Sequence, residues 1–269
     1  MEYVIGGVKH HVELCQDGFP LLCLHGFTGS ASTWKPFCEK WGKHSMLLMP
    51  DIIGHGHTDS PDDVSYYGID QSADCLNQIL EMSGIEKADV LGYSMGGRLA
   101  ITFAVKYPEK VRKLVLESTT PGIRSLEERK SRRRQDETLA FKIMEQGIEN
   151  FIDYWEQIPL FSSQRNLPEK MRESIRELRL KNNATGLANS LRGMGTGTQP
   201  SWWEELRHFN FETLLITGLL DQKFSKIAKE MKKNVPKCQH IQIPGCGHAI
   251  HVEEPEKFGT IVSEFLSNT

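Results

Sequence analysis

Residues 90–100 read VLGYSMGGRLA, and within them an apolar run gives way to a helical pattern at Ser94. Gly92 and Gly96 flank this serine in the order Gly-x-Ser-x-Gly, which is typical of a nucleophile elbow when a strand precedes it and a helix follows. Glycines are needed there because the strand and the helix pass too close for side chains. The helix N-terminus would also favour negative charge at the serine. We therefore predict Ser94 as a nucleophile; an ordinary glycine-rich turn is the alternative.

The pattern around the elbow alternates strands and helices. The expected strands cover 2–14 as a hairpin, 20–24, 45–49, 88–91, 111–117, 213–218 and 240–243. The expected helices cover 32–41, 69–83, the run after Ser94 that ends at Tyr107, 125–144, 169–180, 224–234 and 255–267. Such alternation favours an α/β fold in which helices cover both faces of a parallel sheet.

One segment interrupts this alternation. Residues 121–200 hold charge-rich helical runs and no convincing strand. Eighty residues are too many for an unstructured loop within a compact domain, so we expect an inserted helical lid. The predicted division is a core made of residues 1–120 and 201–269, with the lid at 121–200.

The composition of the chain excludes some classes of binding partner. The 269 residues include 32 Lys and Arg against 35 Asp and Glu, a net charge of −3 that gives no general attraction to nucleic acid. The six cysteines show no C-x-x-C spacing, which predicts free thiols in a reducing compartment. The first residues lack the basic and then apolar pattern of a signal peptide, and no apolar run reaches 18 residues, so we expect neither a secretion signal nor a membrane span. We expect a cytoplasmic monomer without membrane or nucleic-acid partners and without a cofactor.

A serine hydroxyl needs an imidazole to take its proton and an acid to orient that imidazole. After an elbow of this kind the partners follow in the order Ser, Asp or Glu, then His. Asp221 lies just past the strand at 213–218, and His248 lies in a glycine-rich loop after the last strand. We predict a triad of Ser94, Asp221 and His248. The alternatives are a helix cap for Asp221 and a surface position for His248.

His251 is the alternative candidate for the base, and Glu117 is the alternative candidate for the acid. The oxyanion hole is predicted to use the backbone N–H of Met95, which follows the nucleophile, and that of Phe27. Phe27 belongs to the glycine-rich turn HGFTGS at 25–30, at the end of the expected strand 20–24. A tight connection without chemistry is the alternative interpretation of that turn.

The loop at 50–60 contains His55 and His57. A metal site there would need further ligands, and the segment supplies no acidic or histidine partner at helical spacing. We predict a glycine-stabilised turn and no metal.

From the HGF turn at 25–27 through the elbow to the Gly-His pair at 247–248, the chain resembles the α/β hydrolases. The resemblance implies a mostly parallel sheet of about eight strands, flanked by helices and carrying an inserted helical lid. Tyr93 before the serine, Arg98 four residues after it and the run LESTTPGI at 116–123 resemble one branch, the 2-succinyl-6-hydroxy-2,4-cyclohexadiene-1-carboxylate synthases of menaquinone (vitamin K2) biosynthesis.

The branch implies a carbon–oxygen lyase that removes pyruvate from a small-molecule tricarboxylate. Its pattern implies substrate-binding roles for five residues of this sequence, Tyr93, Arg98, Arg132, Trp155 and Arg179. Extra residues at 161–168 leave open a shift from Arg179 to Arg176. The remaining basic residues of 129–134 are expected on a solvated helix face, and core packing is the alternative for Trp155 and for the tryptophan pair at 202–203.

The residues favour this lyase chemistry because arginine suits carboxylates and a histidine-activated serine can act as a base on carbon. Two other functions stay open. One is a carboxylesterase or carbon–carbon bond hydrolase that uses the same triad with water. The other is a binding protein on an inactive hydrolase fold.

Overall fold

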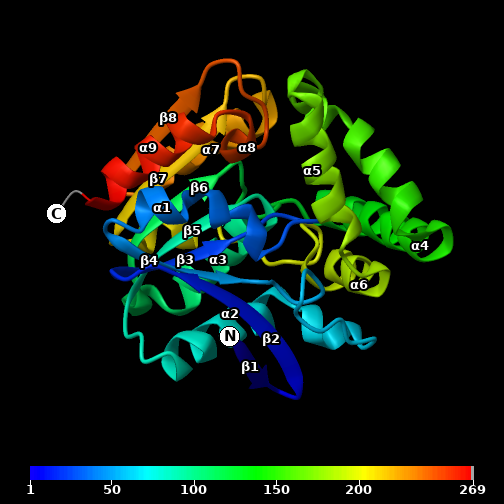
Figure 1. Ribbon diagram of the computed structural model, residues 1–269, viewed down its shortest axis with the longest axis horizontal. Coiled ribbons are helices and arrows are strands. Elements are labelled where there is room, and N and C mark those ends of the chain that lie inside the picture. The colour runs from blue at the N-terminus through cyan, green and yellow to red at the C-terminus, as the bar shows by residue number, and fades with distance from the viewer. Residues whose placement is uncertain (268–269) are drawn as a thin grey trace.

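The computed structural model describes residues 1–267, and its centre is one eight-stranded sheet (Figure 1). The strands are β1 (Glu2–Ile5), β2 (Val8–Cys15), β3 (Phe19–Leu24), β4 (Ser45–Pro50), β5 (Ala88–Tyr93), β6 (Val111–Glu117), β7 (Glu212–Gly218) and β8 (Cys238–Ile243). Their order is β1-β2-β4-β3-β5-β6-β7-β8, and only β1–β2 and β2–β4 pair antiparallel. The prediction of a mostly parallel sheet of about eight strands is confirmed.

Helices cover both faces of the sheet. The core helices are α1 (Cys38–Trp41), α2 (Ile69–Met82), α3 (Met95–Lys106), α7 (Gln222–Asn234), α8 (Ile250–Glu253) and α9 (Pro255–Ser267), and the short 3₁₀ turns of the core are η1 (Ala31–Thr33), η2 (Lys35–Phe37), η3 (Val64–Tyr67), η4 (Pro108–Lys110) and η6 (Glu205–His208). Side chains alternate along the strands, so that α2, α3 and α7 pack on one face while α1 and α9 pack on the other.

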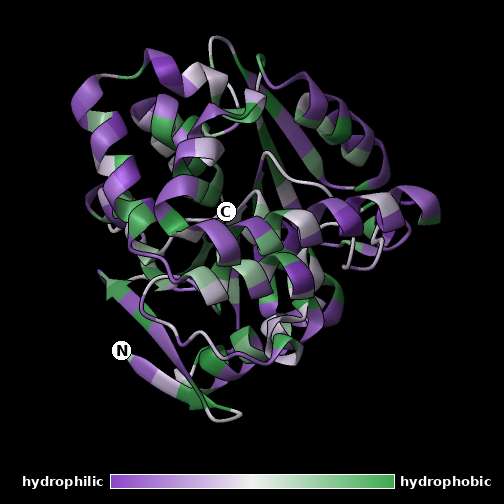
Figure 2. Cartoon of the chain, turned by 90° about the vertical axis from the view of Figure 1, so that its right-hand side faces the viewer, coloured by the Kyte–Doolittle hydropathy of each residue, from purple (hydrophilic) through white to green (hydrophobic). Residues whose placement is uncertain are grey.

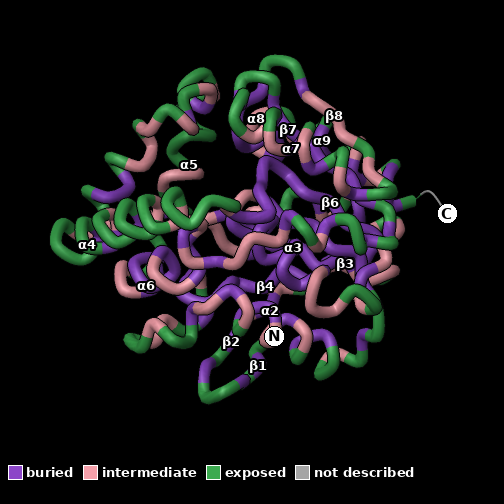
Figure 3. Tube along the Cα trace, turned by 180° about the vertical axis from the view of Figure 1, so that it is seen from behind, coloured by how far each residue is buried: buried purple, intermediate pink, exposed green. Residues whose placement is uncertain are grey.

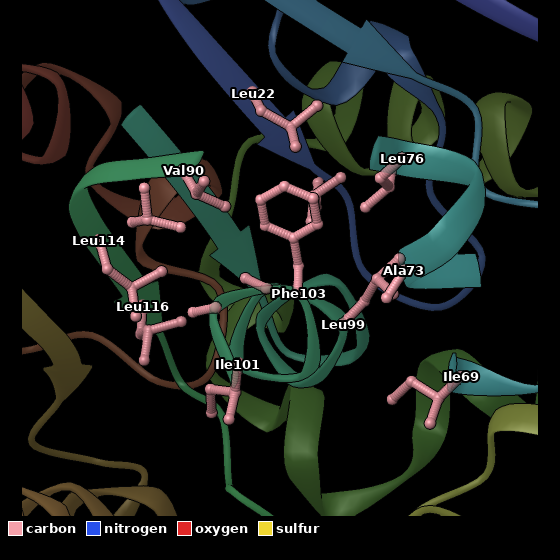
Figure 4. Packing of buried hydrophobic residues seen from close by; sticks show 14 of the residues in the cluster. Leu22, Ile69, Ala73, Leu76, Val90, Leu99, Ile101, Phe103, Leu114 and Leu116 are labelled. Atoms are coloured by element: carbon pink, nitrogen blue, oxygen red, sulfur yellow. The ribbon is translucent and has the colours of Figure 1, made fainter. Parts of the chain in front are cut away.

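The largest cluster lies between the sheet and α3. Figure 4 shows the Phe103 ring of α3 among Leu22, Val90 and Leu76, which come from β3, β5 and α2. Every residue of β5 is buried, as expected for a central parallel strand. Full burial of one such side chain stabilises the fold by about 1.5–3 kcal/mol. The strand that leads into the elbow is therefore anchored on both faces.

The segment predicted as one helix over 32–41 is different in the structure. It forms η1, η2 and α1 instead, three short pieces in succession. Pro36 lies at the start of η2, where it has no backbone N–H to donate. Trp34, Phe37 and Trp41 are buried together against α9, so tertiary packing holds the segment.

Between β6 and β7 the described chain contains helices and no strand. These are α4 (Leu126–Gln157), η5 (Pro159–Asn166), α5 (Glu169–Leu180) and α6 (Ala184–Met194). Figures 1 and 3 place α4, α5 and α6 together at one side of the sheet, and Figure 3 shows α4 exposed over much of its length. The Ser125 hydroxyl caps α4 by accepting from Glu128 N, and Gly147 at φ 78° kinks the helix. The lid boundaries at 121 and 200 stay a prediction.

The prediction that all six cysteines are free is wrong for two of them. Cys15 at the end of β2 and Cys38 at the start of α1 form a disulfide. The spacing in the sequence concealed this pair because the chain folds back between β2 and α1. Cys23, Cys75, Cys238 and Cys246 are free thiols.

Hydrophobic and hydrophilic stretches alternate along the helices in Figure 2. Within residues 1–267, no helix has the length and apolar character that a membrane span requires.

Candidate active site

The elbow forms where β5 ends at Tyr93 and α3 begins at Met95. Ser94 between them has φ 49° and ψ −104°, a conformation that residues with side chains rarely adopt. A Cβ on Gly92 would lie 2.5 Å from the Gly96 carbonyl oxygen, and a Cβ on Gly96 would lie 2.2 Å from that of Leu24. Both glycines are therefore required by the close approach of strand and helix.

The structure brings Ser94, His248 and Asp221 into one hydrogen-bonded line. His248 Nδ1 donates to Asp221 Oδ2 at 2.6 Å, and His248 Nε2 lies 3.0 Å from Ser94 Oγ. Because Nδ1 carries the proton, Nε2 can accept from the serine hydroxyl. The imidazole is 1% exposed, and Phe224 packs beside it with ring centroids 4.7 Å apart. The line can thus move a proton from the hydroxyl to an imidazole shielded from water.

Asp221 uses its two carboxylate oxygens differently. While Oδ2 accepts from His248, Oδ1 accepts from the Phe224 amide at 3.1 Å and caps α7. The helix cap that the sequence offered as an alternative is therefore present together with the histidine contact. The cap fixes the Asp221 carboxylate relative to α7, and the carboxylate in turn holds the His248 ring in place.

The turn after β3 lies against the elbow. His25 Nε2 accepts from the Ile52 amide at 3.0 Å, which leaves Nδ1–H to donate to the Gly26 carbonyl at 2.8 Å. Burial lowers the pKa of His25 to about 4, so the ring is neutral at physiological pH. A Cβ on Gly26 would lie 2.6 Å from the Tyr93 ring. These contacts hold the turn close to the serine.

Phe27 and Met95, the residues predicted for the oxyanion hole, both line the cavity that opens onto Ser94. Neither backbone N–H donates to another group in the part of the chain that the structure describes. Met95 begins α3, where the first amides of a helix lack partners within the helix. The oxyanion hole formed by these two amides stays a prediction.

The cavity over Ser94 has a volume of about 270 Å³. It is lined by both the core and the lid segment, and the predicted residues Tyr93, Arg98, Arg132 and Trp155 all lie on its wall. Tyr93 is buried, and burial next to the Glu117 carboxylate holds the pKa of its phenol well above the usual value. The Trp155 ring lies 5.4 Å from that of Phe27 and 5.7 Å from that of Phe161.

Arginine side chains make this cavity positive. Arg98 Nη1 donates to the Met194 carbonyl at 2.5 Å and to Gln199 Oε1 at 2.6 Å. Burial, together with the charge of Arg132, lowers the pKa of Arg98 to about 10, so it stays charged at neutral pH. Arg132 Nε donates to Asp136 Oδ1 at 2.8 Å. The two guanidinium groups give the cavity a fixed attraction for anions.

Arg179 lies elsewhere. Its Nη1 is 3.3 Å from Glu156 Oε1 and its Nη2 is 3.3 Å from Gln164 Oε1. It lines a neighbouring cavity of about 310 Å³ and not the one that holds Ser94. The alternative, Arg176, pairs with Asp153 and Glu156 and does not line the Ser94 cavity either.

The alternative base His251 and the alternative acid Glu117 pair with each other. His251 Nδ1 donates to Glu117 Oε2 at 2.8 Å, and Glu117 Oε1 also accepts from the His251 amide. Both side chains are buried. The tryptophans at 202–203 donate to Thr102 and to the Gly122 carbonyl, as expected for core packing.

In the histidine loop, His57 Nδ1 lies 3.5 Å from Asp51 Oδ2, and His11 lies near both, a group of three that could hold a metal ion. The Asp51 oxygens, however, already accept from the Ala31 and His57 amides at 2.6 and 2.7 Å. We therefore interpret Asp51 as a residue that stabilises the loop through these backbone hydrogen bonds and not as a metal ligand.

Sequence reasoning missed Lys223, which lines the Ser94 cavity from the first turn of α7. It also missed Phe161, Phe224 and Ser190 on the same wall. The signal for Lys223 was its position two residues after the predicted acid Asp221.

An eight-stranded, mostly parallel sheet with a serine elbow and a Ser-His-Asp line defines the α/β-hydrolase class, and a family model described as the alpha/beta hydrolase fold matches residues 20–255. A Bacillus subtilis protein, named as a candidate 2-succinyl-6-hydroxy-2,4-cyclohexadiene-1-carboxylate synthase, is 48% identical over 92% of this chain and 90% of its own. This chain belongs to that synthase family within the α/β hydrolases.

Two further matches agree. The enzyme named 2-succinyl-6-hydroxy-2,4-cyclohexadiene-1-carboxylate synthase from Enterobacter sp. (strain 638) is 30% identical over 93% of both chains. The solved structure of MenH from S. aureus superposes with a TM-score of 0.91 at 34% identity, covering 95% of this chain and 97% of that one.

Proposed function

We propose that this protein is a carbon–oxygen lyase that converts 2-succinyl-5-enolpyruvyl-6-hydroxy-3-cyclohexene-1-carboxylate to 2-succinyl-6-hydroxy-2,4-cyclohexadiene-1-carboxylate and pyruvate. The relatives are named for this product. The observation that carries the proposal is that Arg98 and Arg132 line the cavity of Ser94. The substrate has three carboxylates, which guanidinium groups bind well, whereas a neutral ester would gain nothing from these charges.

The bond changes follow from the positions of the double bonds. A proton leaves ring carbon 2, next to the succinyl ketone, and its electron pair forms the 2,3 double bond. The 3,4 double bond shifts to 4,5, and the bond from carbon 5 to the enolpyruvyl oxygen breaks, with the electron pair leaving on oxygen. The resulting enolate takes a proton and becomes pyruvate. No water is consumed.

In this proposal Ser94 Oγ takes the proton from carbon while its own proton passes to His248 Nε2, 3.0 Å away. Asp221 stabilises the imidazolium that forms, through the 2.6 Å bond to Nδ1. The imidazolium then returns the proton to the departing enolate. The same residues thus supply the base and the acid in turn.

Negative charge develops on the ketone oxygen as the proton leaves carbon 2. The amides of Phe27 and Met95 are proposed to stabilise it, since donors placed in a shielded site need no reorganisation during the reaction. Tyr93 and Trp155 are proposed to hold the ring, with Arg98 and Arg132 on carboxylates. Arg179 would have to leave Glu156 to reach the substrate.

We further propose that the protein acts in the cytoplasm as a monomer, on this small molecule alone and without a cofactor. The near balance of 32 basic and 35 acidic residues supports the absence of a polyanionic partner. A reducing cytoplasm would open the disulfide between Cys15 and Cys38. The fold must then remain stable without it.

The test compares two reactions of the wild-type protein. Pyruvate release from the enolpyruvyl substrate is followed with a coupled lactate dehydrogenase assay, and hydrolysis of p-nitrophenyl acetate is followed by its colour. We expect pyruvate release to exceed ester hydrolysis by at least about a thousand-fold in kcat/KM, a difference of about 4 kcal/mol in transition-state binding. Rapid ester turnover without pyruvate would instead favour a carboxylesterase.

A further inference from the structure

Lys223 is the cation of the Ser94 cavity that the proposed mechanism does not yet use. It lies in the first turn of α7, and its side chain remains accessible at the cavity wall. Within residues 1–267 its ammonium group forms no hydrogen bond or ion pair, and Nζ lies 5.4 Å from the centroid of the Phe224 ring. Lysine at such a position is free to meet a ligand.

Fold stability does not explain this lysine. The N-terminus of α7 carries the positive end of the helix dipole, which disfavours a cation there. Partial burial of the amine, together with the positive charge of Arg132, lowers the pKa of Lys223. A residue that breaks a local rule without a structural gain is a candidate for function.

The two guanidinium groups of the cavity are each held in place by hydrogen bonds to the protein. Arg98 donates to Met194 and Gln199, and Arg132 donates to Asp136. Asp221, the acid whose charge acts on Lys223, is bound to His248. Lys223, by contrast, has no hydrogen-bond or ion-pair partner among residues 1–267, and its neighbour Phe224 packs against the His248 ring.

We propose that Lys223 binds the carboxylate of the departing pyruvyl group. This assignment rests on the proposed function. The three cations of the cavity would then match the three carboxylates of the substrate. The leaving group is assigned to Lys223 because the enolate must collect its proton from His248, whose ring packs against Phe224, the residue next to Lys223. Its charge favours the bond cleavage because the enolate oxygen gains negative charge there.

The test uses Lys223→Met, which keeps the length of the side chain and removes its charge. Lys226→Met is the matched control, since this lysine lies on the same helix, is exposed and does not line the cavity. Pyruvate binding to each protein is measured by saturation-transfer NMR. We expect the Kd for pyruvate to rise about 10- to 100-fold in Lys223→Met, the range of a lost charge-assisted hydrogen bond, and to stay unchanged in Lys226→Met.

Turnover provides the second readout. Lys223→Met should lower kcat/KM for pyruvate release by about the same factor, and Lys223→Arg should restore part of it. The melting temperature should not fall, since the helix loses an unfavourable charge. Unchanged pyruvate affinity in Lys223→Met, or an equal loss of pyruvate affinity in Lys226→Met, would overturn the assignment. Wild-type protein that binds pyruvate but does not release it from the substrate would contradict the proposed function and leave the Lys223 site standing.

Discussion

At Ser94 the chain holds a strained backbone so that one hydroxyl faces a cavity. A conformation of this kind costs about 1–3 kcal/mol and persists only where the surroundings enforce it. Here the surroundings are Gly92 and Gly96, which let β5 and α3 approach as no other residues could. This requirement is local, and the elbow could therefore be predicted from five residues.

The first prediction concerns the Ser-His-Asp line. Ser94→Ala and His248→Ala should each lower kcat for pyruvate release by at least about a thousand-fold, because either change removes proton transfer as a unit. Asp221→Asn should cost less, since the amide still caps α7 while it orients the ring poorly. Steady-state kinetics on each variant measure the effect.

Far-UV circular dichroism and the melting temperature serve as the control for that series, since the folded structure should persist in all three variants. A Ser94→Ala protein that keeps wild-type kcat would rule out a role for the serine in proton transfer.

Other site residues show where sequence reasoning at this scale ends. Arg98 was predictable because four residues on a helix set its distance from Ser94. Arg179 was placed by resemblance alone, and its side chain is bound to Glu156 and Gln164 instead of lining the Ser94 cavity. Lys223 was missed because its position two residues after Asp221 does not reveal that the fold places it and Arg132, from distant parts of the chain, on the wall of one cavity.

Among the elements, the buried strands were predicted best. The expected strand at 111–117 and the expected helix at 169–180 match β6 and α5 residue for residue. α6 was not predicted, because its sequence ATGLANSLRGM contains glycine, asparagine and serine, which favour other conformations. Contacts with α4 and the Asn183 cap hold it instead. Tertiary packing thus outweighed local preference.

The second prediction belongs to the link between β2 and α1. The disulfide between Cys15 and Cys38 closes a separation of 23 residues, so the double change Cys15→Ser and Cys38→Ser should lower the free energy of unfolding by about 3 kcal/mol. Neither cysteine lines the Ser94 cavity, so kcat should stay the same. Urea unfolding with and without dithiothreitol measures the effect.

The matched control for the disulfide is Cys75→Ser with Cys238→Ser, which removes two free thiols. Dithiothreitol should destabilise the wild type and this control equally, and it should not affect the variant that lacks Cys15 and Cys38. Insensitivity of the wild type to the reductant would contradict a stabilising bridge.

On the scale of the whole molecule, the fold class followed from the alternation of strands and helices. The order of the strands did not, because the hydrophobic pattern of a strand says which residues are buried and not which strand lies beside it. The disulfide and the path of residues 31–41 could not be predicted for the same reason. Long-range pairing is a property of the assembled sheet.

The third prediction concerns acid. Burial lowers the pKa of His25 to about 4 and that of His55 to about 3, from an ordinary 6.5. Below pH 6.5 the unfolded chain binds protons that the native protein does not, so stability is fully present above pH 6.5 and falls toward pH 4. Each histidine should approach about 1.4 kcal/mol per pH unit in this window.

Urea unfolding between pH 7 and pH 4.5 measures this slope. In His55→Asn it should be smaller by about one proton, or about 1.4 kcal/mol per pH unit, than in the control His208→Asn, whose histidine is exposed. Equal slopes in the two variants would show that His55 takes up its proton in the folded protein as readily as in the unfolded chain.

The two carboxylate oxygens of Asp221 accept hydrogen bonds from different donors, one from the Phe224 amide and one from His248. Fraying of a single helical turn would therefore release the imidazole while the sheet stayed intact. On heating, catalytic activity should therefore be lost at a temperature at which most of the protein is still folded. Its working limit would be set by a few residues at one helix end, well before the rest of the protein melts.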